Sequence, residues 1–294
     1  MNIGRLLTAM ITPFDENGDI NYDMAAKLSK AIIDSGSDGL VIGGTTGEAP
    51  TISDQEKLKL FSIVKESIGP KHALIAGTTN NNTKESIKLS KLAEAAEVDG
   101  LLLTVPSYNK PTQDGLYQHF KSISEEVSIP CILYNVPSRT SLNMTDETTI
   151  KLSNLGNIVG IKEASNDLDQ ITRIISNTSD DFKVWSGNDN ETLYILAAGG
   201  YGIVSVAGHI VSSQIKELIG HVLEGNIEVA GKEHQRLLEF FNIIFVVTNP
   251  IPIRYYVKKA GYDIGSPRLP MTEPDEQTKA ILDESLKKYN IDLK

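Results

Sequence analysis

An alternation of short apolar runs with longer amphipathic stretches constrains the fold of this chain more than any other feature of its sequence. The apolar runs predict eight strands, which begin near Leu6, Gly39, Ala73, Gly100, Pro130, Ile158, Phe182 and Ile203. The stretches that follow them predict helices over residues 21–35, 53–67, 83–96, 113–126, 145–153, 167–177, 189–197 and 211–223. Eight such pairs, repeated about every 20 to 35 residues, match a (β/α)8 TIM barrel better than a doubly wound sheet.

A helical region follows the barrel pattern. Ser53 and Glu56, three residues apart, form a capping box that starts one of the barrel helices, and Thr145 suits the start of another. Beyond Glu224 the strand signal stops, and the remaining residues predict helices over 226–245, 252–260 and 273–288. We therefore expect a barrel over residues 1–224 and a small helical C-terminal subdomain over residues 225–294.

Composition excludes several classes of protein. The 294 residues, 40% hydrophobic and 22% charged, are enough for one large core. A net charge of -10, with no block of Lys or Arg, would not neutralise a phosphate backbone, so we expect no nucleic acid partner. Apolar stretches such as Ile243 to Val247 fall short of the roughly 20 residues that span a bilayer.

The run from Leu6 to Ile11 predicts a strand and not a signal peptide, because no small-residue cleavage site follows. The single cysteine, Cys131, has apolar neighbours, which fits a buried core thiol in a reducing cytoplasm.

Several familiar ligand motifs fail on inspection. Residues 15–19 begin like a calcium loop, but the glycine is misplaced and Ala26 stands where a bidentate Glu is needed, so we expect a turn. The five histidines show no paired-ligand spacing, so we expect no metal held by the protein. Residues 43–48 are glycine-rich but lack the Walker lysine and the GxGxxG spacing, so we expect no nucleotide cofactor. Their backbone N–H groups and two hydroxyls suit a small carboxylate.

Two polar residues close neighbouring apolar runs. Lys162 follows Asn157 to Ile161, and Tyr134 follows Pro130 to Leu133, so each stands where a buried parallel strand ends. A free lysine is the neutral nucleophile in only about one molecule in a few thousand at neutral pH, but burial or a nearby cation such as Arg139 would lower its pKa. Taken singly, Lys162 reads as a solvated lysine at the barrel mouth and Tyr134 as a packed aromatic. Together with the hydroxyl-rich glycine loop they favour a catalytic site.

Three longer motifs carry a family resemblance. Gly44-Thr45-Thr46-Gly47-Glu48, the run from Tyr134 to Thr140, and Gly160-Ile161-Lys162-Glu163-Ala164 resemble the signatures of the dihydrodipicolinate synthase family. That family lies within the pyruvate-dependent class I aldolase superfamily, which includes N-acetylneuraminate lyase. Residues 109–111, 118–120, 249–252 and 268–270 extend the resemblance over essentially the whole chain.

The resemblance implies four catalytic residues. Lys162 would form a Schiff base with pyruvate, and Tyr134 would donate and accept protons during imine formation and ring closure. Thr45 and Tyr108 would complete a proton relay with Tyr134, the Tyr108 hydroxyl coming from a neighbouring subunit. The family also implies a homotetramer made of two dimers, with active sites at a dimer interface.

Four further residues are implied to bind substrate. Thr46 would hold the pyruvate carboxylate, and Val204 would contact the same substrate through its main chain. Gly187 would also bind substrate. Arg139 would pair with the carboxylate of L-aspartate 4-semialdehyde. The implied reaction condenses these two substrates to 4-hydroxy-tetrahydrodipicolinate, at the branch point of diaminopimelate and lysine biosynthesis. It is a lyase-type synthase reaction with no metal or external cofactor.

Alternatives and departures remain. A 2-keto-3-deoxy sugar acid lyase or N-acetylneuraminate lyase would share the lysine, tyrosine and threonine, but Ser138-Arg139-Thr140 matches the synthase pattern. A barrel that only binds a keto acid is the alternative from another class. Ser107 and Thr79 depart from the family pattern, as does Val204 in place of the usual Ile. The cleft that binds inhibitory lysine in other members aligns with Ala49, Asp54, Lys57, Asn81, Glu85 and Ser107, a poorly matched set, so we expect little or no inhibition by lysine.

Overall fold

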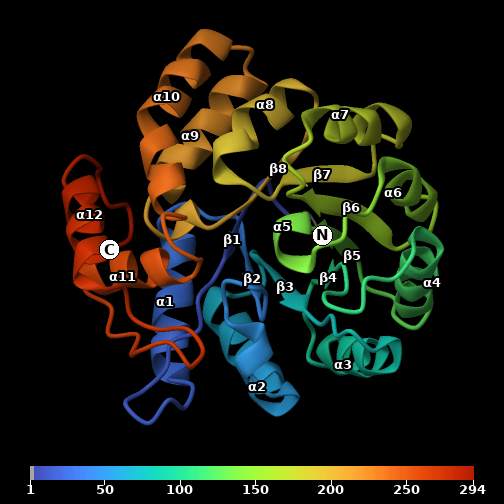
Figure 1. Cartoon of the computed structure of the whole chain (residues 1–294), viewed down its shortest axis with the longest axis horizontal. Helices are drawn as coiled ribbons and strands as arrows, with labels where there is room; N and C mark the ends of the chain where they lie inside the picture. The colour runs from blue at the N-terminus through green and yellow to red at the C-terminus, as the bar shows by residue number, and fades with distance from the viewer. Residues whose placement is uncertain (1–2) are drawn as a thin grey trace.

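Eight short parallel strands close into a barrel in which each strand pairs with the next along the chain. The computed structural model describes residues 3–294 (Figure 1). The strands are β1 (Leu6–Ala9), β2 (Gly39–Ile42), β3 (Ala73–Gly77), β4 (Gly100–Thr104), β5 (Cys131–Asn135), β6 (Ile158–Glu163), β7 (Lys183–Ser186) and β8 (Gly202–Ser205). β8 pairs with β1, which completes the ring. All eight lie at the positions expected from the apolar runs, so the predicted (β/α)8 barrel is confirmed.

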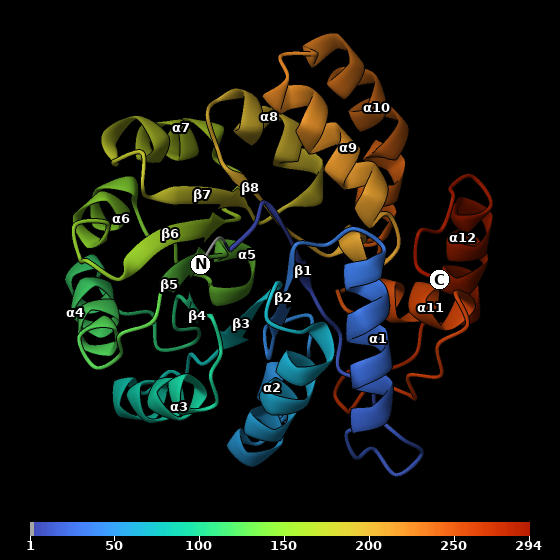
Figure 2. The ribbon, with the colours of Figure 1, turned by 180° about the vertical axis from the view of Figure 1, so that it is seen from behind.

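Helices surround the strands, as the views from the two sides show (Figures 1 and 2). The barrel helices are α1 (Tyr22–Asp34), α2 (Asp54–Ile68), α3 (Thr83–Ala95), α4 (Gln113–Ser124), α5 (Pro137–Thr140), α6 (Asp146–Leu152), α7 (Leu168–Asn177), α8 (Thr192–Ala197) and α9 (Ser212–Leu223). The expected capping box is present at the start of α2, and the Thr145 side chain caps α6. The single-turn helix α5 is an addition to the prediction, because four residues are too few to show helical periodicity.

Side-chain alternation along the strands divides the barrel core into two clusters. One cluster fills the barrel interior and includes Leu7, Val41 and Trp185; the larger one packs the strands against the helices and includes Cys131, a buried thiol as expected. Tyr134 belongs to the interior cluster and pairs in register with Lys162 on the next strand. The two residues therefore meet at one end of the barrel, on the inner face of adjacent strands.

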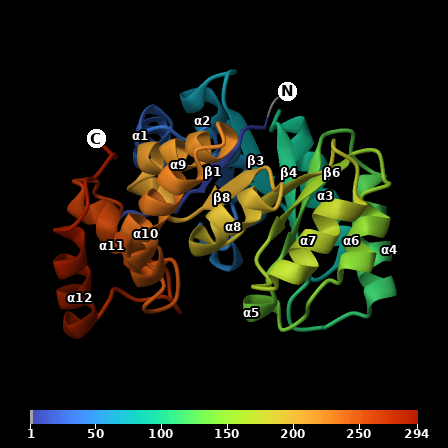
Figure 3. The same ribbon diagram turned by 90° about the horizontal axis from the view of Figure 1, so that it is seen from above.

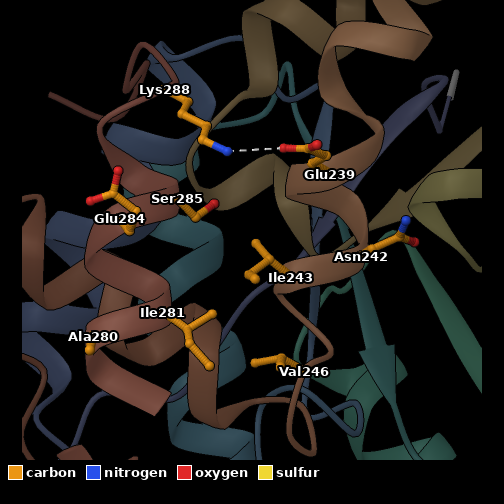
Figure 4. Close-up of a pocket in the computed structure, with 9 residues that line it drawn as sticks. All are labelled: Glu239, Asn242, Ile243, Val246, Ala280, Ile281, Glu284, Ser285 and Lys288. Atoms are coloured by element: carbon orange, nitrogen blue, oxygen red, sulfur yellow. Dashed lines mark hydrogen bonds and ion pairs between the residues drawn. The ribbon is translucent and has the colours of Figure 1, made fainter. Parts of the chain in front are cut away.

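Three helices follow the barrel: α10 (Ile227–Ile243), α11 (Ile251–Lys259) and α12 (Glu276–Leu286). Figure 3 shows α11 and α12 at one side of the barrel, beyond α9 and α10. A groove of about 720 Å³ separates α10 from α12, and the pair of Lys288 with Glu239, 3.3 Å apart, crosses it (Figure 4). None of the residues expected in the active site lines this groove. Within residues 3–294, no helix is both long and apolar enough to cross a membrane.

Candidate active site

Lys162 lies near the carboxyl end of β6 with its side chain in the barrel interior. Only 5% of the residue is exposed, and Nζ lies 4.2 Å from the centroid of the Tyr134 ring. Burial lowers the Lys162 pKa to about 7; Asp189 opposes this shift and Arg139 adds to it. About half of the side chains are then neutral at pH 7, so the amine is available as a nucleophile without an external base.

Tyr134 responds to the same burial in the opposite direction. It lies near the carboxyl end of β5, and burial raises the pKa of its phenol to about 12, with Arg139 opposing the shift. Loss of hydration disfavours the charged form of each group, which is the cation for lysine and the anion for tyrosine. The pair thus brings a nucleophilic amine next to a protonated hydroxyl, the combination that general acid catalysis at a carbonyl requires.

A cavity of about 290 Å³ opens above these two residues. Six of the eight expected site residues line it, namely Thr45, Thr46, Tyr134, Arg139, Lys162 and Gly187. The other lining residues are Val136, Ser138, Asn188, Val206, Phe245, Thr248 and Asn249. The cavity is of a size for small organic acids and has the Arg139 guanidinium in its wall beside the Lys162 amine, so it suits anionic substrates.

The other two expected residues lie elsewhere. Val204 is buried on β8 in the same interior cluster as Tyr134, and the neighbouring Val206 lines the cavity in its place. Tyr108 follows β4 in a left-handed conformation, with a φ of 69°, and is 93% exposed. Its hydroxyl does not contribute to the cavity wall of its own chain.

The loop that carries Thr45 and Thr46 follows β2 and is held by the C-terminal region. Glu48, at the end of this loop, is buried and has a left-handed φ of 59°. Its Oε1 accepts a hydrogen bond from Arg254 Nη1 at 3.0 Å, and its Oε2 accepts one from the Arg268 backbone N–H at 3.0 Å. Residues more than 200 positions away in the chain therefore help to place the two threonines.

Asn249 is a site residue that sequence reasoning missed. Its Nδ2 donates a hydrogen bond to Thr46 Oγ1 at 2.9 Å, and its main-chain oxygen accepts one from Arg139 Nη2 at 3.3 Å. The partners are 203 and 110 positions away along the chain, so no local pattern could reveal the contacts. Its only sequence signal is the Asn-Pro pair after a predicted helix, which contributes to the family resemblance alone.

Two buried carboxyl groups, Glu163 and Asp189, form hydrogen bonds next to the site. Glu163, next to Lys162 on β6, accepts hydrogen bonds from Asn135 Nδ2 at 3.0 Å and from the Ser165 N–H at 2.8 Å, and burial raises its pKa to about 7. Asp189 accepts from the backbone N–H groups of Val206 and Ala207, at 3.1 and 3.3 Å. The Glu163 contact with Asn135 joins the ends of β6 and β5, and the Asp189 contacts join the segment after β7 to the end of β8.

Comparison with known proteins places this chain in a family. The model of the dihydrodipicolinate synthetase family matches residues 2–289. A 4-hydroxy-tetrahydrodipicolinate synthase from Dehalococcoides mccartyi is 53% identical over 291 residues, which cover 99% of this chain and 98% of that protein. One from Bacillus velezensis is 47% identical over 282 residues, covering 96% of this chain and 98% of the relative.

Solved structures agree with the sequence comparison. The crystal structure of dihydrodipicolinate synthase from Aquifex aeolicus superposes with a TM-score of 0.95 at 40% identity and covers 99% of both chains. One from Cyanidioschyzon merolae, with lysine bound, has a TM-score of 0.96 at 40% identity and covers 97% of this chain and 98% of the other. The chain belongs to the dihydrodipicolinate synthetase family.

Proposed function

We propose that this chain is an enzyme that condenses pyruvate with L-aspartate 4-semialdehyde to 4-hydroxy-tetrahydrodipicolinate, the branch-point step of diaminopimelate and lysine biosynthesis. Relatives that match nearly the whole chain are named 4-hydroxy-tetrahydrodipicolinate synthase. The observation that carries the proposal is the buried Lys162, with a pKa of about 7, beside Tyr134 in a cavity with hydroxyl and guanidinium groups.

The chemistry starts at Lys162. Its neutral amine attacks the keto carbon of pyruvate, Tyr134 protonates the departing hydroxyl, and water leaves as the imine forms. The protonated imine withdraws electrons, so a methyl proton is lost and an enamine results. The enamine carbon then attacks the aldehyde of the second substrate. The amino group of the second substrate then adds to the imine carbon and displaces Lys162. This step closes the ring and restores the free lysine amine.

The remaining site residues take binding and relay roles. Thr46 holds the pyruvate carboxylate through its hydroxyl and backbone N–H, and Arg139 pairs with the carboxylate of the semialdehyde. The Val204 main chain completes the pyruvate site, and Gly187 forms part of the substrate cavity wall. Thr45 links Tyr134 to the Tyr108 hydroxyl of a neighbouring subunit. A guanidinium at position 139 also favours the synthase over a sugar acid lyase, which needs groups that bind hydroxyls there.

We further propose that the chain assembles as a homotetramer made of two dimers and works in the cytoplasm. The exposure of Tyr108, 93%, supports a dimer in which this side chain is covered by, and serves, the adjacent subunit. The lone buried Cys131 supports a reducing compartment, because it offers no partner for an internal disulfide.

Borohydride reduction in the presence of pyruvate tests the proposed function. Reduction should add the mass of one pyruvate-derived group to the peptide that contains Lys162, because only an imine between the two is reduced to a stable amine. Lys162→Ala, which removes the amine, serves as the control and should gain no mass. An unlabelled Lys162 in the wild-type chain would overturn the Schiff-base mechanism.

A further inference from the structure

β5 and β6, the two strands that carry the proposed catalytic pair, do not keep one register along their length. Cys131 pairs with Ile158, but the next residue of β5, Ile132, pairs with Gly160. β6 therefore has one extra residue, Val159, at this point, which is a β-bulge. Residues beyond such a bulge face the side opposite to the one that plain alternation would give them.

The bulge decides that Lys162 faces into the barrel. Ile158 packs in the outer cluster, between the strands and the helices, and plain alternation from it would place Lys162 on that outer face and Glu163 on the inner one. With the extra residue, Lys162 instead lies beside the ring of Tyr134, and Ile161 packs outside. A slip of one residue between the strands at this end would remove the amine from the cavity.

A buried hydrogen-bonded pair follows the catalytic residues on these strands. Asn135 and Glu163 lie opposite each other in the ladder, and both have a relative exposure of 0%. Asn135 Nδ2 donates to both carboxylate oxygens of Glu163, at 3.0 and 3.2 Å. This contact forms in the register that also places Tyr134 opposite Lys162. A slip of one residue would turn one of the two side chains inward and break it.

Further hydrogen bonds fix both members of the pair. Asn135 Oδ1 accepts from the Met144 N–H at 3.0 Å, and Glu163 Oε1 accepts from the Ser165 N–H at 2.8 Å. Gln170 Nε2, on α7, donates to the other carboxylate oxygen at 3.5 Å. Displacement of the pair along the strands would break several buried hydrogen bonds at once, and buried polar groups are costly to leave without partners.

We propose that Asn135 and Glu163 are positioning residues that lock the register at the ends of β5 and β6 and so hold Lys162 and Tyr134 side by side in the cavity. The inference rests on the proposed function and deepens it, because the pair acts only through the two catalytic residues. The amine and the phenol must reach adjacent atoms of one substrate, and a displacement of about 1 Å can lower a rate by about a hundredfold. The pair limits that displacement from outside the cavity.

Two variants of Glu163 separate the hydrogen bond from the charge. Glu163→Gln keeps an oxygen that can accept from Asn135 Nδ2, whereas Glu163→Met keeps a similar length without that oxygen. The rate of adduct formation, stopped by borohydride at saturating pyruvate, should fall by about tenfold to a hundredfold in Glu163→Met and by less than about threefold in Glu163→Gln. The pyruvate concentration at half of the maximal rate should change by less than about threefold in both, because Thr46 lies on another loop.

A double variant tests whether the two residues act as one unit. Asn135→Ala should slow adduct formation at least as much as Glu163→Met does, since it also removes the acceptor for the Met144 N–H. Once Asn135 is replaced, adding Glu163→Met should slow the reaction by less than about threefold further, because the contact is already lost.

Asn157→Ala provides a matched control at the opposite end of β6. The Asn157 side chain is half-buried, and its Nδ2 donates to the main-chain oxygens of Ser124 and Val127, at 2.8 and 3.0 Å. The variant therefore also loses hydrogen bonds that anchor β6, but away from the cavity. It should lower the midpoint of thermal unfolding and leave both kinetic quantities at their wild-type values.

The outcomes separate the inference from the function beneath it. If Glu163→Gln is as slow as Glu163→Met, the charge matters and the contact does not, so the inference is wrong. A wild-type rate in Glu163→Met, an equal loss in Asn157→Ala, or losses that multiply in the double variant would also overturn it. Circular dichroism checks each fold, and if Glu163→Met does not fold, the same rate prediction is tested with Asn135→Ala. Trapping of pyruvate in the wild-type chain leaves the proposed function intact in all these cases, and its failure removes both.

Discussion

At the scale of single residues, burial decides the chemistry of the site. Desolvation is the largest influence on the pKa of Lys162 and also on that of Tyr134, and it moves the two values apart, to about 7 and about 12. Both groups are therefore driven toward their neutral forms at neutral pH. Neither pKa shift can be read from the residue type alone, because both shifts arise from the exclusion of water from the barrel interior.

The Lys162 shift predicts how the formation of the pyruvate adduct depends on pH. With a pKa of about 7, the neutral fraction is about one-tenth at pH 6, one-half at pH 7 and nine-tenths at pH 8. The initial rate of adduct formation, stopped by borohydride at subsaturating pyruvate, should rise about tenfold between pH 6 and 8 and then level off. A rate that keeps rising tenfold for each pH unit up to pH 10 would show an unshifted lysine and contradict the prediction.

A matched variant isolates the titrating group, because the Glu163 pKa is also about 7. Glu163→Gln removes that carboxyl while keeping the size of the side chain and an oxygen for the contact with Asn135 Nδ2. The midpoint of the pH profile should stay near 7 in this variant. A profile that becomes flat would assign the titration to Glu163 instead of Lys162.

Arg139 allows a test of how the two substrates divide between the site residues. Arg139→Ala should impair turnover with aspartate semialdehyde far more than it impairs trapping of pyruvate at Lys162, because it leaves a substrate carboxylate without its charged partner. Arg139→Lys should recover only part of the activity, since an ammonium cannot make the two parallel hydrogen bonds of a guanidinium. Equal losses of trapping and turnover in Arg139→Ala would count against the assignment.

At the scale of structural elements, the C-terminal helices act on the loop after β2. Arg254, on α11, is buried, and its guanidinium donates to the backbone oxygens of Thr12 and Ile264 at 2.7 and 2.9 Å as well as to Glu48. One side chain therefore joins the segment after β1, the Thr45 loop and the segment after α11. Through this contact the final part of the chain supports residues that line the cavity.

Replacing Arg254 should reveal that support. Arg254→Met leaves the Glu48 carboxylate buried without its partner, so the free energy of unfolding should fall by about 3 to 5 kcal/mol, and the KM for pyruvate should rise because the loop carries Thr46. Chemical denaturation and steady-state kinetics measure the two effects. Lys232→Met provides the control: its exposed pair with Glu228 should contribute less than about 1 kcal/mol. A similar cost for both variants would mean that the buried pair does not hold the loop.

At the scale of the whole molecule, the position of Tyr108 makes a subunit interface part of the proposed site. A tyrosine that is 93% exposed on one chain has little role there, whereas the same ring in an interface gains burial and a partner for its hydroxyl. The backbone at Tyr108, in the loop after β4, is left-handed with a φ of 69°, a conformation that few non-glycine residues adopt.

Subunit mixing tests whether the relay crosses chains. Tyr108→Phe should lower turnover without unfolding the chain, because it removes one hydroxyl and almost no apolar surface. Mixed with Lys162→Ala chains, it should regain activity, since each hybrid dimer has one site with both Lys162 and a donated Tyr108. Random exchange of equal amounts would restore about a quarter of the sites. No recovery after verified exchange would mean that Tyr108 acts within its own chain or has no catalytic role.

Inhibition by lysine belongs to the same scale, because the family resemblance implies that the relevant cleft would lie between subunits. Asn81 Oδ1, one of the groups that could meet the ligand, already accepts hydrogen bonds from the Ser107 N–H and Oγ, at 3.1 and 3.4 Å. Ser107 lacks the aromatic ring that would wall the cleft, a loss of apolar contact worth about 1 to 3 kcal/mol, or roughly 5-fold to 150-fold in affinity. Lys57, aligned with the same cleft, would place a further basic group near a cationic ligand. Titration with lysine in a steady-state assay should show little or no inhibition. An inhibition curve with a submillimolar midpoint would contradict this prediction.

The sequence by itself determined the order and type of the elements, because apolar periodicity and helix caps act over a few residues. The eight strands and the cap at Ser53 were predictable for this reason, and Lys162 and Tyr134 could be placed at strand ends. Only the tertiary structure decided what joins distant segments: the contact of Asn249 with Thr46 spans 203 positions, and that of Arg254 with Glu48 spans 206. It also decided the charge of the proposed catalytic pair, Lys162 and Tyr134, because a pKa depends on the water and charges that surround a group once the chain has folded.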